Sequence, residues 1–120
     1  MSEFILHATS QAAWTAARAG GLYFADSSAD EGFIHCSKAD QILRVADSFF
    51  RGQHDLVLMV IDPGRLTSKL RWELGTDLAT ELFPHIYGPI NLEAVLEVFN
   101  FEPAADGKFH LPACLELAGR

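Results

Sequence analysis

The chain has 120 residues, of which 49% are hydrophobic, and it carries a net charge of −7. This length fits one domain, and the hydrophobic content excludes an intrinsically disordered chain. The negative balance argues against binding to duplex nucleic acid, which depends on Lys and Arg side chains that neutralise phosphates. A small anionic ligand needs only a few local cations, and Arg44, Arg51 and Arg71 are the candidates.

The N-terminal part predicts a strand followed by a helix. Residues 3–8 are an apolar run that leads into two hydroxyl residues, Thr9 and Ser10. Either hydroxyl is a suitable N-cap, and residues 11–19 are rich in alanine, the strongest helix former. The two glycines that follow predict the end of this helix, because glycine adopts positive φ readily.

A second strand and a second helix follow after a polar loop. Residues 22–25 predict a short extended stretch, residues 26–32 a loop, and residues 33–36 a strand. Ser37 is expected to cap the next helix. That helix is predicted to run to about Phe50, since its apolar residues recur at helical spacing.

Strands dominate the next part of the chain. The run Leu56–Ile61 is wholly apolar and predicts a central strand that is buried on both faces. Residues 70–74 alternate between apolar and charged side chains, so Arg71 and Glu73 are expected on one face of a strand.

The last strands complete an α+β pattern. Residues 85–87 predict a short strand between two prolines, and residues 94–99 predict the last clear strand. From Pro103 onward we expect a tail, in which residues 109–117 form an edge strand or pack loosely. Two early helices followed by strands predict one α+β domain over residues 1–120 rather than a parallel βαβ array.

The sequence shows no signal-peptide or membrane-span pattern and few cysteines, which bears on the expected compartment and redox state. The residues after Met1 have neither a basic n-region nor an apolar h-region, and no run approaches the ~20 apolar residues of a membrane span. We therefore expect a cytoplasmic protein. Cys36 and Cys114 are too few for a disulfide scaffold. Cys36 is expected to be a buried thiol that diverges from His35, because neighbours on a strand point to opposite faces.

Three of the five histidines lie at predicted strand ends, next to hydroxyl or glycine residues: His7, His35 and His85. Imidazole donates, accepts or changes charge near neutral pH. We expect these three to converge on one polar site, although each alone also fits a hydrogen-bonded core histidine. His54 and His110 are expected to face solvent.

Other polar and aromatic residues could complete such a site. Arg71 and Glu73 form either a surface ion pair or an anion clamp beside a carboxylate base, and Glu81 is a second carboxylate. Tyr23 and Tyr87 either stack on a planar ligand or pack in the core. Three histidines and a water would also suit a hydrolytic zinc ion, but no HExxH spacing is present, so we expect no metal.

Four segments carry a resemblance to a known family: residues 7–9 (HAT), 31–37 (EGFIHCS), 55–58 (DLVL) and 83–90 (FPHIYGPI). From about residue 4 to residue 99 the chain resembles the bacterial domain-of-unknown-function 952 family. That family has no established activity to carry over. Its fold is similar to that of ADP-ribosyltransferases, which implies a split mixed or antiparallel sheet.

Short motifs extend the resemblance to NAD chemistry. The segment His7-Ala8-Thr9 is similar to the opening His-Gly-Thr of ADP-ribosyltransferases, whose histidine and hydroxyl hold the NAD ribose. Residues 21–25 resemble their Gly-Ile-Tyr-Phe-Ala segment, which implies ring stacking by Tyr23. Residues 34–37 resemble the Val-His-Leu-Ser stretch of RNA 2′-phosphotransferases, but the arginines around that histidine are missing here. The acidic balance also disfavours an RNA substrate.

The resemblance and the polar strand ends together imply a cleft that binds NAD or a related ADP-ribose nucleotide. The expected nucleotide-binding residues are His7, Thr9, Tyr23, Ser37, Arg71, His85 and Tyr87, and the expected catalytic residues are His35 and either Glu73 or Glu81. ADP-ribosyl transfer or NAD cleavage is a second hypothesis, in which Arg71 binds pyrophosphate, His7 orients the ribose and the carboxylate stabilises the cation. The alternatives are a non-catalytic module that binds a metabolite or a protein, and a zinc hydrolase.

Overall fold

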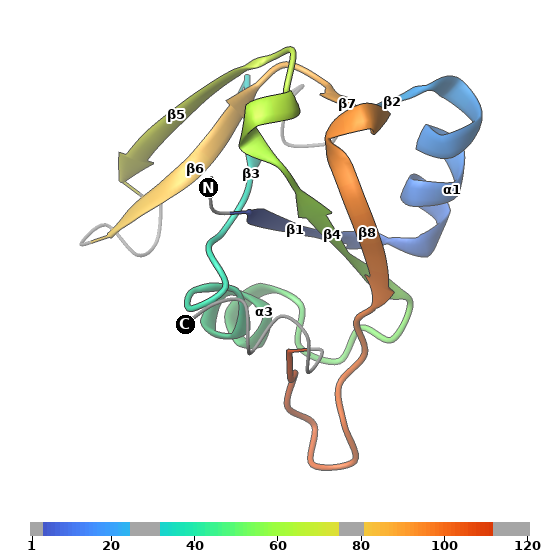
Figure 1. Ribbon diagram of the computed structural model, residues 1–120. Coiled ribbons are helices and arrows are strands. Elements are labelled where there is room, and N and C mark those ends of the chain that lie inside the picture. Colours follow the sequence, from blue (N-terminus) through green and yellow to red (C-terminus); the bar gives the residue numbers. More distant parts are fainter. Residues whose placement is uncertain (1–3, 25–31, 75–80, 112–120) are drawn as a thin grey trace.

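A computed structural model describes residues 4–24, 32–74 and 81–111 (Figure 1). Its elements are β1 (Ile5–Ser10), α1 (Gln11–Gly20), β2 (Leu22–Tyr23), β3 (Ile34–His35), α3 (Ile42–Phe49), β4 (Leu56–Ile61), β5 (Lys69–Leu74), β6 (Leu82–Tyr87), β7 (Ile90–Asn91) and β8 (Val95–Asn100), with 3-10 turns at Pro63–Arg65 and Leu92–Ala94. The elements form one α+β domain with antiparallel sheets, which confirms the predicted class.

Within the described ranges, the strands form three antiparallel sheets. The central sheet has the order β1-β4-β8, the short sheet pairs β2 with β7, and the outer sheet has the order β3-β6-β5. All six residues of β4 are buried, and this strand lies between two others, which confirms the predicted central strand. Its side chains alternate, so β4 contributes to a core on each face of the central sheet.

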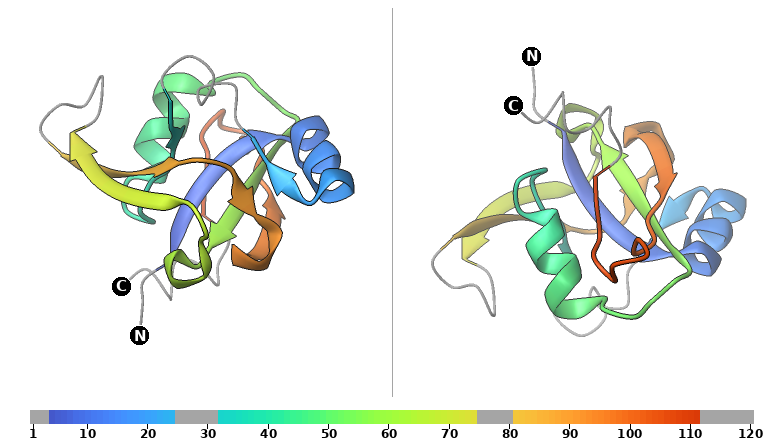
Figure 2. Two further views of the ribbon diagram at one scale, coloured as in Figure 1. Left: turned by 90° about the horizontal axis from the view of Figure 1, so that it is seen from above. Right: turned by 90° about the horizontal axis from the view of Figure 1, so that it is seen from below.

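The two cores contain different helices. On one face, Leu58 and Val60 of β4 pack with Ile42 of α3 and with Phe101 and Phe109, whose ring centroids are 4.9 Å apart. On the other face, Met59 and Ile61 pack with α1 and with residues of the short and outer sheets. Figure 2 shows α1 and α3 on different sides of β1. The central sheet is therefore the middle layer of the domain.

One buried imidazole connects all three sheets. His7 of β1 is 8% exposed. Its Nδ1 lies 2.6 Å from the carbonyl oxygen of His35 in β3, and its Nε2 lies 2.8 Å from the hydroxyl of Tyr23 in β2. A carbonyl only accepts, so Nδ1 carries the proton and Nε2 accepts from Tyr23. Burial lowers the pKa of His7 to about 4, which keeps the ring neutral near pH 7.

The strand around His85 is longer than predicted. β6 runs from Leu82 to Tyr87 and includes Pro84, whereas the sequence predicted a strand only over residues 85–87 because proline donates no ladder bond. Pro84 is tolerated because its carbonyl accepts from the amide of Cys36, 3.0 Å away. In antiparallel pairing the N–H and C=O of one residue point to the same side of the strand. The N–H that Pro84 lacks would therefore face Cys36, just beyond the end of β3.

The second helix begins later than predicted. Ser37 does not cap it: the amide and carbonyl of Ser37 instead pair with those of Leu6, at 2.8 and 2.7 Å. The helix α3 starts at Ile42, after Gln41, whose side-chain oxygen accepts from the amide of Lys38 at 3.0 Å. Long-range pairing of the chain at residue 37 outweighs the local capping preference.

The first helix agrees with the prediction. The hydroxyl of Ser10 accepts from the amide of Ala13 at 3.1 Å, and Gly21 adopts a left-handed conformation with φ 89° after the last residue. The predicted loop at residues 26–32 lies, except for Gly32, outside the described residues, as does most of the predicted strand over residues 109–117. No helix in the described ranges combines the length and the apolar character that a membrane crossing requires.

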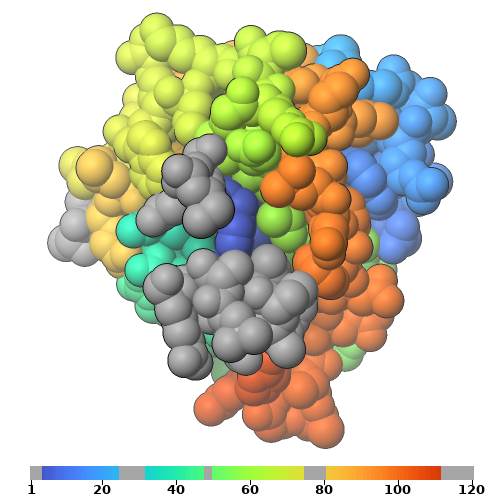
Figure 3. Space-filling view, viewed as in Figure 1, coloured from blue at the N-terminus to red at the C-terminus, as the bar shows by residue number. Residues whose placement is uncertain are grey.

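The outer sheet ends in a hairpin of β5 and β6 that projects from the body of the domain (Figures 1 and 2). β5 forms the upper left rim of the surface in Figure 3. Its six residues pair with β6, from Lys69 opposite Tyr87 to Leu74 opposite Leu82. Arg71 and Glu73 therefore share one face of this sheet, as predicted.

Gly88 connects β6 to β7 at a position where a side chain does not fit. Its φ is +144°, and a Cβ atom here would lie 2.4 Å from the hydroxyl oxygen of Ser68. That hydroxyl is held by a bond of 2.7 Å to the carbonyl of Pro89. We expect Gly88→Ala to lower the free energy of unfolding by about 1–3 kcal/mol through backbone strain and overpacking. Urea unfolding monitored by circular dichroism measures this loss.

The matched control is Gly20→Ala at the end of α1, where a Cβ meets nothing within 4 Å. Alanine in a helix is expected to be neutral or to stabilise by up to about 1 kcal/mol. Equal effects of the two substitutions would contradict the steric role of Gly88.

The buried neutral His7 predicts a specific pH dependence. The unfolded chain binds a proton at His7 below about pH 6.5, whereas the folded protein resists protonation down to a pKa of about 4. The contribution of neutral His7 to the free energy of unfolding is therefore complete above pH 6.5. It falls by roughly 3 kcal/mol as the pH drops to 4. We expect the stability difference between wild type and His7→Gln to shrink by that amount between pH 7 and pH 4 in urea titrations.

The control for this experiment is His54→Gln, since His54 is exposed. Its stability difference from wild type is expected to stay nearly constant over the same range. A difference between wild type and His7→Gln that does not change with pH would mean that His7 is not held neutral by burial.

Candidate functional site

Polar and aromatic side chains gather on one face of the outer sheet. His35 pairs with His85 across β3 and β6, and His85 pairs with Arg71 across β6 and β5. Side chains two residues apart share a face, which adds further members. This group is called the histidine face and comprises Phe33, His35, Arg71, Glu73, His85 and Tyr87.

A carboxylate lies at the centre of the polar contacts. Oε1 of Glu73 is 2.9 Å from Nδ1 of His85 and accepts a hydrogen bond of 2.5 Å from the hydroxyl of Tyr87. The bonds from Tyr87 and His85 hold the pKa of Glu73 below its usual value. The hydrogen bond from Tyr87 to Glu73 raises the pKa of Tyr87, because the phenol proton is shared with an anion. Near neutral pH the site thus contains an ionised carboxylate and a neutral phenol.

A cation lies beside this carboxylate. The guanidinium carbon of Arg71 is 5.6 Å from the centroid of the Tyr87 ring, within the range of a cation–π contact. Arg71 is exposed. Its charge is therefore held over an aromatic ring while its hydrogen-bond donors face the surface.

The ring of Phe33 packs against both histidines. Phe33 stacks on His85 with ring centroids 4.2 Å apart and an interplanar angle of 22°. Phe33 also contacts the rings of His35 and Tyr87, with centroid distances of 4.7 and 5.3 Å. The His35 and His85 rings meet edge to face at 5.3 Å. Phe33 was missed as a site residue, although the predicted strand over residues 33–36 places it on the same face as His35.

One ring nitrogen in this cluster is left without a partner among the described residues. His85 is 2% exposed, and its Nε2 is buried with no hydrogen bond. Its Nδ1 is already engaged with Glu73. A buried polar atom without a partner is costly and requires a specific explanation, such as a role at a functional site.

Of the three predicted histidines, His35 and His85 share the histidine face, whereas His7 meets it through the main chain of His35. The ring of His7 binds the main chain of His35, and the ring of His35 contacts that of His85. Both ring nitrogens of His7 are engaged within the protein. Tyr23 is 2% exposed, and its hydroxyl lies 2.8 Å from both His7 and the hydroxyl of Thr9. His7, Thr9 and Tyr23 therefore form a buried support behind the histidine face.

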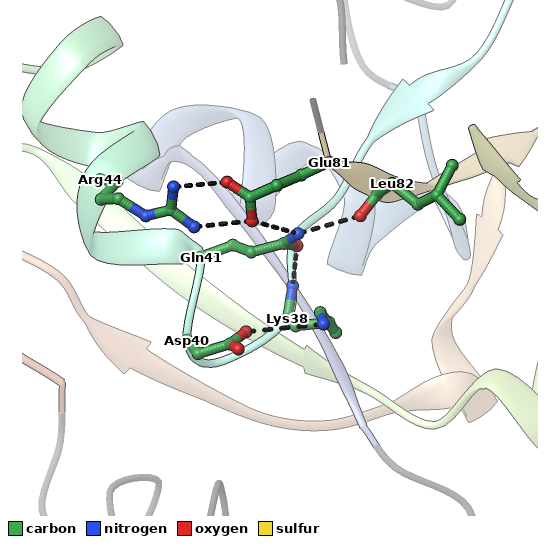
Figure 4. A network of polar contacts seen from close by, with 6 residues as sticks. All are labelled: Lys38, Asp40, Gln41, Arg44, Glu81 and Leu82. Atoms are coloured by element: carbon green, nitrogen blue, oxygen red, sulfur yellow. Dashed lines mark hydrogen bonds and ion pairs between the residues drawn. The ribbon is translucent and has the colours of Figure 1, made fainter. Parts of the chain in front are cut away.

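Ser37 and Glu81 lie apart from the histidine face. Ser37 is buried and joins the main chain of β1. Glu81 forms a two-point ion pair with Arg44 of α3, at 2.5 and 2.8 Å (Figure 4). The bonds from Arg44 lower the pKa of Glu81 to about 2. The sequence analysis left either Glu73 or Glu81 as the catalytic carboxylate. In the structure Glu73 contacts His85, and Glu81 connects α3 to the start of β6.

Gln41 completes the contacts around Glu81. Its side-chain amide donates to the carbonyl of Leu82 at 2.9 Å and lies 3.4 Å from Glu81 (Figure 4). Gln41 is 1% exposed. This buried amide was missed by the sequence analysis, because a lone glutamine has no distinctive pattern.

The zinc-hydrolase alternative finds no donor set in the described residues, where no three His, Cys, Asp or Glu side chains are placed to hold a metal ion. The histidines differ too much in their contacts, since both nitrogens of His7 bind the protein itself. Cys36 is a buried free thiol, as predicted, and burial raises its pKa. Cys114 lies outside the described residues.

A separate shallow groove of about 540 Å³ lies between α1 and β8. Trp14 and Arg18 of α1 line it together with Leu96 and Val98 of β8. None of the histidines contributes to this groove. The groove and the histidine face are therefore distinct features of the surface.

Comparison with solved structures shows that the chain is similar to CC0527 from Caulobacter crescentus. Its crystal structure is 33% identical, covers 94% of this chain and 98% of that chain, and superposes with a TM-score of 0.82. Its solution NMR structure is 34% identical, covers 95% of this chain and 97% of that chain, and gives a TM-score of 0.80. No curated protein sequence matches the chain.

A family model described as "Protein of unknown function (DUF952)" matches residues 8–98. This range nearly coincides with residues 4–99, over which the sequence resembles that family, and it extends from the second half of β1 through most of β8. The match confirms the resemblance. The chain therefore belongs to the DUF952 family.

Proposed function

We propose that the histidine face binds NAD or a related ADP-ribose nucleotide. The observation that carries this proposal is the grouping of an ionised carboxylate, Glu73, with an exposed guanidinium, Arg71, and the aromatic ring of Phe33 on one face. A dinucleotide presents an anionic pyrophosphate, ribose hydroxyls and flat bases. Each of these groups has a chemically matched partner on this face.

The contacts suggest a role for each side chain. Arg71 would pair with the pyrophosphate, since guanidinium binds phosphate oxygens through two parallel bonds. The exposed ring of Tyr87 offers a flat surface to a base. The Nε2 of His85 is buried in the ring cluster with Phe33, so a bond from this nitrogen to a ribose hydroxyl would require Phe33 to move aside. His85 and Tyr87 both bond Oε1 of Glu73, which leaves Oε2 for the site.

We also propose that the fold is that of the ADP-ribosyltransferases. The supporting features are the separate antiparallel sheets and the position of His7 and Thr9 on β1 beside Tyr23. In this proposal the three residues position the site from behind. His7 holds β3 through the carbonyl of His35, so that the His35 ring meets His85.

The catalytic form of the proposal is NAD cleavage. The bond between the nicotinamide nitrogen and C1′ of the ribose breaks, nicotinamide leaves with the electron pair, and an oxocarbenium-like cation develops on the ribose. Glu73 is ionised near neutral pH, and a fixed carboxylate stabilises that cation. The oxygen of water or of an acceptor hydroxyl then bonds to C1′ and loses its proton.

The alternative is a non-catalytic module that binds a small metabolite. One observation favours it: the hydrogen bonds from Tyr87 and His85 already neutralise part of the charge on Glu73. A carboxylate held in this way is a weaker partner for a developing cation. Binding and cleavage are therefore tested separately.

The binding test is a thermal-shift titration with NAD, ADP-ribose and nicotinamide. A ligand at ten times its Kd stabilises the folded state by about 1.4 kcal/mol, which raises the Tm of a domain of this size by roughly 3–6 °C. We expect this rise with NAD or ADP-ribose for wild type and its loss in Arg71→Ala. The control Arg51→Ala removes an exposed arginine after α3 and is expected to keep the shift. No shift for wild type at millimolar nucleotide would contradict the proposal.

The catalytic test is release of nicotinamide from NAD, followed by chromatography over hours. We expect Glu73→Gln to keep the thermal shift with NAD but to slow nicotinamide release about 100-fold, because the amide carries no charge to stabilise the cation. His35→Ala is expected to abolish release. Glu97→Gln changes an exposed carboxylate on β8 and should behave like wild type. Binding without release by wild type would favour the non-catalytic module.

A further inference from the structure

The outer edge of β5 is open in the described part of the chain. The outer sheet has the order β3-β6-β5, so β5 pairs with β6 on one side and with no described strand on the other. The hairpin projects from the domain, and β5 forms its rim (Figures 1 and 3). An open strand edge is a template for pairing with another strand.

The main-chain groups on this edge belong to alternate residues. Trp72 lies opposite Pro84, whose carbonyl bonds to Cys36 on the far side of β6. Trp72 and Pro84 are thus a pair that exchanges no hydrogen bonds. In antiparallel pairing the N–H and C=O of Trp72 then point outward, and so do those of Leu70 and Leu74.

One face of the hairpin exposes apolar side chains. Trp72 is 44% exposed, Leu74 is 59% exposed, and Leu82, which lies opposite Leu74 on β6, is 52% exposed. They lie on the sheet face opposite the histidine face, by the alternation of the strand. β5 also contains no proline and pairs without a register shift. Of the devices that usually block edge pairing, proline and bulges are absent from this described strand, whereas charged side chains are present at Lys69, Arg71 and Glu73.

The sequence of β5 is complementary to itself in one antiparallel register. If a second β5 pairs so that Trp72 lies opposite its own copy, Arg71 lies opposite the partner's Glu73 and Leu70 opposite the partner's Leu74. Opposite charges facing each other across strands stabilise a sheet. Of the neighbouring centres, Glu73 places that charge opposite itself, and Leu70 places Lys69 opposite Arg71. A centre at Arg71 also places that charge opposite itself, but it sets Lys69 opposite the partner's Glu73 and is therefore the competing register.

We propose that β5 is a dimer interface, in which the edges of two copies of this chain pair antiparallel about a two-fold axis at Trp72. The outward main-chain groups of Leu70, Trp72 and Leu74 fit this register, because each of these residues then forms a pair that exchanges two hydrogen bonds. The two outer sheets join into one continuous sheet. The apolar side chains of both hairpins meet on one face of that sheet.

The dimer also affects the candidate site. Arg71 and Glu73 are members of the histidine face, so pairing brings the partner's Arg71 next to Glu73 on the same side of the joined sheet. The two histidine faces then become neighbours across the axis. This inference does not depend on nucleotide binding, and dimerisation is measured without any ligand.

The first test is sedimentation equilibrium from about 1 to 500 μM protein. We expect wild type to reach twice its chain mass of 13.2 kDa. Arg71→Glu and Glu73→Arg each place two like-charged pairs across the axis and are expected to raise the dimer Kd about tenfold or more. The double variant Arg71→Glu with Glu73→Arg restores both opposite-charge pairs, so we expect its Kd to return toward the wild-type value.

A monomer at every concentration would overturn the proposal. A dimer whose Kd is unchanged by the single charge reversals would also overturn it. So would a double variant that dimerises more weakly than both single variants. Circular dichroism melts show whether each variant is folded. A double variant that is folded and monomeric counts against the proposal.

The second test reads the register directly in a Cys114→Ser background, in which the remaining native thiol, Cys36, is buried. Trp72→Cys places two thiols opposite each other at the axis, at a Cα separation of about 5.5 Å that suits a disulfide. Leu74→Cys places them four residues apart, roughly 13 Å along the strands. We expect rapid oxidative cross-linking of Trp72→Cys and none of Leu74→Cys. The reverse pattern would overturn the Trp72-centred register.

Discussion

The arrangement of this domain depends on the buried imidazole of His7. It is the one side chain whose described hydrogen bonds join strands of all three sheets: it lies on β1, donates to β3 and accepts from the hydroxyl of Tyr23 in β2. Burial keeps the ring neutral, and only the neutral ring donates at one nitrogen and accepts at the other. The polar network is therefore satisfied in one protonation state, and that state specifies how the sheets meet.

The histidine face follows from this junction. His7 holds the main chain of His35, which sets the position of β3 beside β6 and brings the His35 ring to the edge of His85. From there the contacts continue to Glu73, Tyr87 and Arg71 on the outer sheet. The carboxylate, phenol and guanidinium are thus displayed on a rigid surface whose support is buried. Such support is what a binding site requires to keep its geometry.

The outer sheet has two faces with different chemistry. One side of the outer sheet carries the histidine face, and the opposite side exposes Trp72, Leu74 and Leu82. Both meet at the edge of β5, where Arg71 and Glu73 alternate with the apolar residues. Pro84 contributes to this edge indirectly, because its bond to Cys36 directs the main-chain groups of Trp72 outward. The surface proposed for nucleotide binding and the edge proposed for dimerisation therefore share two charged residues.

Local pattern by itself determined much of this protein: the capped helix α1, the fully buried strand β4, and the shared face of Arg71 and Glu73. These features depend on residues close in the chain. Only the tertiary structure decided that Ser37 pairs with Leu6 instead of capping a helix, that β6 continues through Pro84, and that Glu73 rather than Glu81 meets the histidines. The physical reason is that each of these outcomes depends on hydrogen bonds between segments far apart in sequence, which no local periodicity encodes.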